Sequence, residues 1–280
     1  MSRYSLITLT DDSAGSSASI APERGAIVTS FKVRGRELLY LDPVTFEDPA
    51  KNVRGGIPIL FPSPGKLVND VWQREGRGGS LKQHGFARTR AWQPIATSDR
   101  EVTLQLSSDA ATLEQFPWPH LATLRLVLEG ARLRLNMSIR NTGTETMPFG
   151  LGYHPYFAVT DKAHARVETD GTRQFDNLTK SAGPFMGFDL TAKEVDLHLL
   201  DQKARHMPLV LGDGAMIDVR ASEEFAHWVV WTLAGSDFVC VEPWTCPGNA
   251  LNTGERLIEL APGCTHTSWM EIAFSAATDE

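Results

Sequence analysis

Hydrophobic and polar residues alternate along much of the chain, and the clearest case is a pair of consecutive segments. Leu124, Leu126 and Leu128 are separated by mostly polar neighbours, and after Glu129-Gly130 the alternation resumes over residues 133–139. A period of two places successive side chains on opposite faces of a β-strand. We therefore predict a β-hairpin with one buried face and one hydrated face.

Other apolar segments rich in β-forming residues predict further strands at 102–106, 227–232, 237–242, 256–260 and 267–274. The one clear helix signal covers 109–116, where Asp109 can cap the first turn and Pro117 can end the helix. Many short strands without alternating helices are typical of a large antiparallel sandwich or barrel. We expect an all-β fold with few short helices, forming one domain over residues 1–280.

Charge and cysteine content narrow the class of protein. The net charge is -7 and no run of lysines or arginines occurs, which argues against nucleic acid and anionic membranes as partners. The first residues lack the apolar core of a signal peptide, and no segment is long enough to span a membrane. Cys240, Cys246 and Cys264 form no CxxC motif and read as free thiols in a reducing compartment. We expect a cytoplasmic protein that is a monomer or a weak homodimer.

Three candidate functional residues lie in segments that combine polar residues with turn-forming residues: Glu242, His154 and His84. Glu242 follows the apolar residues 238–241, so its carboxylate lies near the core, where an unpaired charge would cost several kcal/mol. Pro243 holds it in an extended conformation. Taken singly, the glutamate could serve in a structural ion pair, and each histidine could be a hydrogen-bonded core residue.

Two arginines accompany these residues. Arg54 precedes a Gly-Gly pair that would let backbone approach a ligand, and Arg88 lies four residues after His84. Neither glycine-rich phosphate-loop spacing is present. One or two local arginines can nevertheless bind a phosphate in an acidic protein, although Arg54 could equally be a surface charge.

A histidine and a carboxylate suffice for proton transfer at a hemiacetal. Ring opening requires a proton delivered to the ring oxygen and another removed from the anomeric hydroxyl, and closure reverses both transfers. A histidine can be the acid and a carboxylate the base, each contributing roughly 10²–10⁴-fold. This chemistry needs neither a redox cofactor nor a metal.

Seven segments, in order along the chain, resemble the aldose 1-epimerase (galactose mutarotase-like) family. They include Gly-Ile-Pro-Ile-Leu-Phe-Pro, His-Gly-Phe-Ala-Arg, His-Pro-Tyr-Phe and Val-Glu-Pro-Trp-Thr, and they cover residues 25–39, 56–62, 84–88, 116–120, 141–148, 154–157 and 241–245. The resemblance implies an antiparallel β-sandwich of the supersandwich type with a sugar cleft on one face. It also implies an isomerase that interconverts the α and β anomers of an aldohexose or hexose 6-phosphate.

The resemblance assigns roles to individual residues. His154 is expected to be the general acid, Glu242 the general base, and His84 a hydrogen-bonding partner of the sugar. Arg54 and Arg88 resemble the phosphate-binding arginines of the branch that acts on hexose 6-phosphates, although the segments 61–67 and 151–157 also resemble a bacterial branch acting on unphosphorylated sugars.

The same family often places a sugar-binding aspartate between its histidine and glutamate segments. Asp176 and Asp189 are the candidates, and we select Asp176. Trp244 is expected to offer the sugar an apolar wall.

Two other classes of protein remain open. A sugar-binding protein could keep the cleft without catalysis, because a fold does not guarantee an activity. A metal enzyme could use His84, His154 and Glu242 as ligands, although the close H-x-H or H-x-E spacing common in such sites is missing. We predict no cofactor and no metal, and a small sugar or sugar phosphate as the partner.

Overall fold

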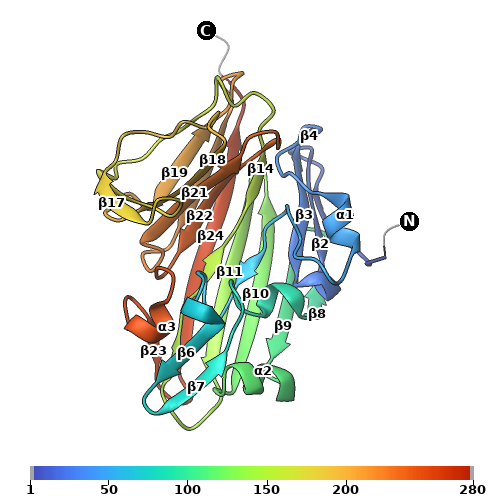
Figure 1. The fold of residues 1–280 in the computed structure, drawn as a ribbon. Coiled ribbons are helices and arrows are strands. Elements are labelled where there is room, and N and C mark those ends of the chain that lie inside the picture. Colours follow the sequence, from blue (N-terminus) through green and yellow to red (C-terminus); the bar gives the residue numbers. More distant parts are fainter. Residues whose placement is uncertain (1–2, 278–280) are drawn as a thin grey trace.

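The computed structural model describes residues 3–277 and consists mainly of antiparallel strands arranged in two large sheets (Figure 1). The first sheet has the order β15 (Arg166–Val167), β19 (His206–Val210), β20 (Met216–Ala221), β24 (Thr265–Ser275), β11 (Arg132–Asn141), β10 (His120–Glu129), β9 (Glu101–Ser107), β8 (Gln93–Thr97).

The second sheet has the order β17 (Ser181–Pro184), β16 (Arg173–Asp176), β18 (Glu194–Leu199), β21 (His227–Leu233), β22 (Phe238–Trp244), β13 (Gly152–Tyr153), β5 (Ile59–Leu60), with β14 (Tyr156–Ala158) also paired to β22. The all-β prediction is confirmed, and the structure is a large antiparallel sandwich with few short helices.

One hydrophobic core joins the two sheets. Leu124 and Leu135 from the first sheet belong to the same buried cluster as Val230 and Val241 from the second sheet. Each of these side chains is fully buried, which contributes about 1.5–3 kcal/mol relative to exposure. In β10 and β11 the core uses one face of the strand and leaves the other face to more exposed residues, whereas β22 is buried on both faces.

The hairpin and the helix predicted from the sequence are both present. β10 pairs with β11, and Leu124 lies opposite Met137 on the buried face. Helix α2 (Ala110–Gln115) begins at Asp109, whose carboxylate accepts a hydrogen bond from the Thr112 amide in a capping box. The hairpin and the helix are both stabilised by contacts between residues close in sequence. The local pattern of residues therefore predicts them.

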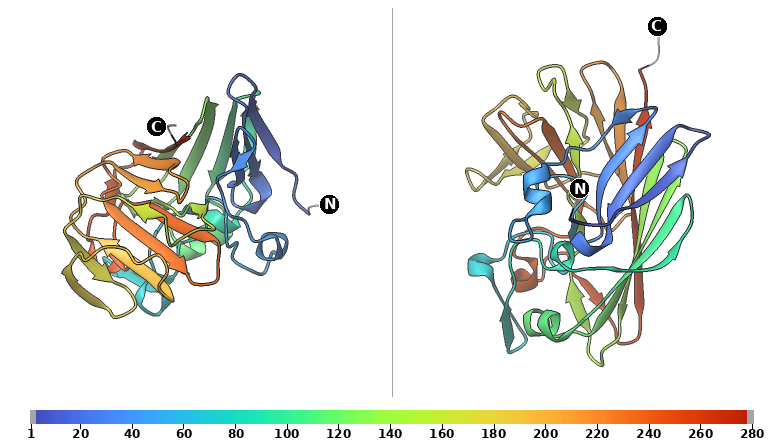
Figure 2. Two further views of the ribbon diagram at one scale, coloured as in Figure 1. Left: turned by 90° about the horizontal axis from the view of Figure 1, so that it is seen from above. Right: turned by 90° about the vertical axis from the view of Figure 1, so that its right-hand side faces the viewer.

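The remaining elements are small. They are the N-terminal sheet of β1 (Ile7–Asp11), β2 (Ser16–Ala21), β3 (Ile27–Val33) and β4 (Arg36–Glu37), the pairs β6 (Val71–Arg74) with β7 (Arg77–Ser80) and β12 (Met147–Phe149) with β23 (Ile258–Leu260), helices α1 (Pro43–Glu47) and α3 (Ala250–Thr253), and 3-10 turns at Pro22–Arg24, Val68–Asp70 and Ala87–Thr89. Figure 2 shows the N-terminal strands, in blue, as a layer beside the green strands of the first sheet. None of the helices in the described part of the chain has the length and apolar character needed to span a membrane.

The five predicted strand ranges differ from the observed strands by one to three residues, and one of these differences bears on the site. The strand predicted over 256–260 is shorter, since β23 covers only Ile258–Leu260. The strand predicted over 237–242 is longer, because Trp244 pairs with both His227 and Gly152 and so extends β22. Glu242 consequently lies inside a strand rather than at its end.

Candidate active site

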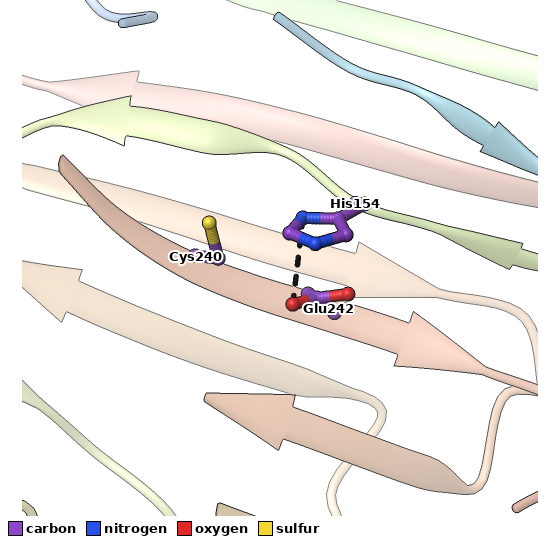
Figure 3. Close-up of side chains that lie close together, drawn as sticks. All are labelled: His154, Cys240 and Glu242. Atoms are coloured by element: carbon purple, nitrogen blue, oxygen red, sulfur yellow. Dashed lines mark ion pairs between the residues drawn. The ribbon is translucent and has the colours of Figure 1, made fainter. Parts of the chain in front are cut away.

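The register of the second sheet brings His154 and Glu242 together. Gly152 of β13 lies opposite Trp244, and Tyr156 of β14 lies opposite Cys240. Continuing this register across the gap between β13 and β14 places His154 opposite Glu242. Directly opposed residues project from the same face with Cβ atoms about 4.5–5.5 Å apart. The His154 Nδ1 atom accordingly lies 3.4 Å from the Glu242 Oε1 atom (Figure 3).

The neighbouring strands add further polar groups to this face. Val229 of β21 lies opposite Glu242, and His198 of β18 lies opposite Val229. Because the side-chain period is two, Asp196 also projects from this face of β18. The alternate residues of β21 and β22 that point the other way, such as Val230 and Val241, belong to the core.

These side chains line a cleft of about 910 Å³. Six of the seven residues that the sequence nominated line it, and they come from four separate parts of the chain: His84, His154, Glu242, Arg54, Arg88 and Trp244. The volume suits a small ligand, since such sites typically measure about 300–1,000 Å³.

Burial controls the protonation of the His154–Glu242 pair. Glu242 is 1% exposed and accepts a hydrogen bond of 3.1 Å from the Trp244 indole N–H. Burial, and next the negative charge of Asp196, raise the pKa of Glu242 well above its usual value. Burial, and next the charges of His84 and Arg88, lower the pKa of His154 well below its usual value.

Both pKa shifts favour the uncharged forms, because burial penalises an imidazolium and a carboxylate alike. At 3.4 Å the two groups titrate as a coupled pair, in which one member can donate a proton and the other can accept one. The pair therefore has the composition that simultaneous acid and base catalysis requires.

His84 is held in a fixed, uncharged form beside this pair. Its Nδ1 atom contacts the carbonyl oxygen of Pro64, so Nδ1 carries the hydrogen, and the Gln83 amide lies 3.2 Å from Nε2. Burial lowers the pKa of His84 to about 3, with the charge of Arg88 as the next cause. Its backbone has a left-handed φ of 70°, and a Cβ on the adjacent Gly85 would lie 2.2 Å from the Phe61 carbonyl oxygen. The close approach of the backbone at this turn therefore requires glycine at position 85.

Arg54 and Arg88 line the same cleft without a carboxylate partner among residues 3–277. The Arg88 Nη2 atom donates to the Gln83 carbonyl at 3.0 Å, and its buried Nε atom has no hydrogen-bond partner. Burial lowers the pKa of Arg88 to about 10, so the guanidinium remains protonated at neutral pH. Two cations without counterions make this end of the cleft suitable for an anion.

Arg24, which the sequence did not nominate, organises the loop that leads to Arg54. Its buried guanidinium donates four hydrogen bonds of 2.6–3.2 Å to backbone carbonyls of this loop, those of Thr45, Phe46, Asp48 and Lys51. Within residues 3–277 its hydrogen-bond acceptors are all backbone carbonyls, so this arginine fixes the chain conformation and does not neutralise an acidic group.

Asp176 does not line the cleft. Residues Phe175 and Asn177 do, and a period of two directs Asp176 to the opposite face of β16. Its carboxylate instead accepts backbone hydrogen bonds from Leu178 and Thr179. The alternative candidate Asp189 is exposed, outside the cleft, and bonded to Thr191.

Asp196 occupies the cleft in their place. Its Oδ2 atom accepts a hydrogen bond of 2.7 Å from the Asn177 amide, and its Oδ1 atom lies 3.3 Å from the His198 Nε2 atom. The segment Glu-Val-Asp-Leu-His-Leu (194–199) alternates strictly between polar and apolar residues. That alternation, which predicts a strand with a polar face, was the signal that could have found Asp196 and His198.

A comparison of the whole sequence with known protein families leads to the same family that the short motifs resemble. Residues 5–273 match the sequence model of the family described as aldose 1-epimerase. The chain belongs to the aldose 1-epimerase family. Membership confirms the resemblance seen in the seven segments.

Individual relatives within this family extend the comparison. The Slr1438 protein of Synechocystis sp. PCC 6803 has a solved structure that superimposes with a TM-score of 0.95 at 37% identity, covering 98% of this chain and 96% of that chain. A structure named as a putative aldose 1-epimerase from Escherichia coli K12 has a TM-score of 0.82 at 18% identity, with coverage of 97% and 99%, and shows the shared fold.

A curated relative from Cenchrus ciliaris, named "putative glucose-6-phosphate 1-epimerase", is 36% identical over 168 residues. The match covers 55% of this chain and 48% of that protein, so the chain spans about half the length of this relative.

Proposed function

We propose that this aldose 1-epimerase family member interconverts the α and β anomers of a hexose 6-phosphate, with His154 as general acid and Glu242 as general base. The observation that carries the proposal is the 3.4 Å approach of these two buried side chains at the floor of the cleft. The ring oxygen and the anomeric hydroxyl are both bonded to C1 of the sugar. A donor and an acceptor must therefore lie close together to serve both oxygens.

The reaction proceeds by ring opening and closure. The reactive form of the pair is the one in which the proton lies on His154 and Glu242 is a carboxylate. Glu242 then removes the proton of the anomeric hydroxyl while His154 delivers its proton to the ring oxygen, and the C1–O5 bond breaks. Rotation about the C1–C2 bond then presents the other face of the aldehyde. Closure returns both protons and yields the other anomer, so the enzyme ends in its starting protonation state.

Further cleft residues bind the sugar in this proposal. The neutral His84 and the carboxylate of Asp196 supply hydrogen bonds to sugar hydroxyls, and Asp196 takes the place first assigned to Asp176. The Trp244 ring, whose edge lies against His84 with centroids 5.9 Å apart, offers an apolar surface to the sugar.

The unpaired arginines support a phosphorylated substrate. Arg54 and Arg88 both line the cleft, and both act on the charge of the Tyr156 phenol, so the two guanidinium groups lie near the same side chain. A guanidinium presents a planar set of donors that matches phosphate oxygens. The name of the Cenchrus ciliaris relative is consistent with the same class of substrate.

The test is anomer exchange measured by NMR with glucose 6-phosphate, glucose and galactose. We expect the enzyme to exchange the anomers of glucose 6-phosphate faster than the spontaneous rate, and to show its highest kcat/KM with this sugar. Exchange of free sugars with equal or greater efficiency would remove the phosphate assignment. Saturable binding of all three without any catalysed exchange would instead favour a sugar-binding protein.

A further inference from the structure

A third potential ligand atom lies beside the acid and base pair. Cys240 precedes Glu242 by two residues on β22, so both side chains project from the same face of that strand toward His154 (Figure 3). One ligand atom from each of the three residues lies within 4.8 Å of the other two. The mechanism proposed above uses the histidine and the glutamate but gives the thiol no task.

This group is enclosed and incompletely satisfied. Cys240 is fully buried and forms no disulfide, and Glu242 is 1% exposed. The Nδ1 atom of His154 is buried and has no hydrogen-bond partner, although it faces the carboxylate. An imidazole nitrogen, a thiolate sulfur and a carboxylate oxygen are the donor types that Zn²⁺ prefers.

The spacing is close to that of a zinc site. Zn–N and Zn–O bonds of about 2.0–2.2 Å and Zn–S bonds of about 2.3 Å place tetrahedral ligands roughly 3.3–3.7 Å apart. The observed 3.4 Å between His154 Nδ1 and Glu242 Oε1 already falls in this range. The Cys240 sulfur lies within 4.8 Å of the other two ligand atoms, so binding the same ion requires it to approach each of them by at most about 1.5 Å.

We propose that His154, Cys240 and Glu242 form an inhibitory binding site for Zn²⁺ and similar thiophilic divalent cations. Zn²⁺ enters from the cleft, which His154 and Glu242 line. Each Zn–S bond that forms releases the thiol proton to solvent, and a carboxylic acid form of Glu242 releases its proton as well. The fourth position stays open toward the cleft and is filled by water, as in other three-ligand zinc sites.

Zinc bound in this way stops catalysis, an inference that rests on the proposed function. The metal occupies the lone pair of the histidine and an oxygen of the glutamate. Neither group can then exchange a proton with the sugar. The enzyme is consequently expected to be active after treatment with a chelator and to lose activity when Zn²⁺ is added.

The experiment titrates Co²⁺, a spectroscopic substitute for Zn²⁺, into the chelator-treated full chain in a buffer without thiols. A thiolate bound to Co²⁺ produces a charge-transfer band in the near ultraviolet. Wild type is compared with Cys240→Ser, which keeps the side-chain shape but removes the thiolate, and with Cys264→Ser, which removes the exposed cysteine. Inhibition by Zn²⁺ is measured in parallel, each variant against its own metal-free rate.

We expect the band in wild type and Cys264→Ser, its loss in Cys240→Ser, and its displacement by Zn²⁺. The Zn²⁺ concentration for half-inhibition should rise by at least about tenfold in Cys240→Ser. A band that survives in Cys240→Ser, the lack of a band in wild type, or activation by Zn²⁺ would overturn the proposal. If the band behaves as expected while every form lacks epimerase activity, the metal site stands and the proposed function fails.

Discussion

Replacing Glu242 by glutamine separates proton transfer from the architecture of the cleft. The amide has almost the shape of the carboxylate, and its oxygen can still accept the 3.1 Å hydrogen bond from Trp244. It cannot accept a proton from the anomeric hydroxyl. The substitution therefore removes the proposed chemical step and leaves the packing intact.

The expected loss follows from the role of the residue. Removing a general base costs roughly 10²–10⁴-fold in rate, which corresponds to about 2.7–5.4 kcal/mol of transition-state stabilisation. Stability should change little, within about 1 kcal/mol, because burial already opposes ionisation of Glu242 and raises its pKa. A low kcat together with an unchanged melting temperature is thus the predicted signature.

Two-dimensional exchange NMR on the α and β anomeric protons of glucose 6-phosphate provides the assay, with the spontaneous rate subtracted. Glu194→Gln is the matched control, because Glu194 lines the same cleft and accepts a 3.1 Å hydrogen bond from Trp231. We expect the control to lose less than about tenfold. A Glu242→Gln rate within threefold of wild type, or equal losses in both variants, would refute the assignment of Glu242 as the base.

Three further outcomes are expected. Arg88→Gln should raise KM for glucose 6-phosphate at least about tenfold and leave kcat/KM for glucose nearly unchanged, whereas equal losses on both sugars would contradict a phosphate site. Arg24→Met should lower the free energy of unfolding in urea by about 2 kcal/mol or more and raise KM for the phosphorylated sugar, because four loop carbonyls lose their donor. An unchanged free energy of unfolding and an unchanged KM would show that the loop keeps its conformation without Arg24. The pKa of His84 falls to about 3 on folding, so the unfolded chain binds more protons below about pH 6.5, and stability should decline as the pH falls, by up to about 1.4 kcal/mol per pH unit. The melting temperature of His84→Asn should fall less steeply between pH 7 and 5 than that of wild type, and identical slopes would contradict this.

Local patterns along the chain were sufficient for several strands and for one helix. The alternation around Leu124 and Leu135 predicts the β10–β11 hairpin, and the Asp109 cap with Pro117 predicts α2, because each depends on residues close in sequence. The same alternation at 194–199 predicts β18, although the strand was not recognised from it. Such patterns report which face of an element is buried.

The grouping of site residues was predictable only through the resemblance to a family. His84, His154, Arg54, Arg88 and Glu242 are spread over nearly 190 positions, and no local pattern relates them. Their motifs, in order, were sufficient to nominate six residues that line one cleft. The aspartate had no motif, and the choice of Asp176 therefore went to a residue on the wrong face of β16.

The sequence by itself determined the strands, the apolar face of each and the residue types available for acid and base catalysis. Only the tertiary structure decided strand register, and register decides which side chains meet. A shift of one residue between β22 and the segment 152–158 would direct Glu242 away from His154, since neighbouring residues in a strand face opposite sides. The pKa shifts also arise only on folding, because they come from burial and from charges brought close by that register.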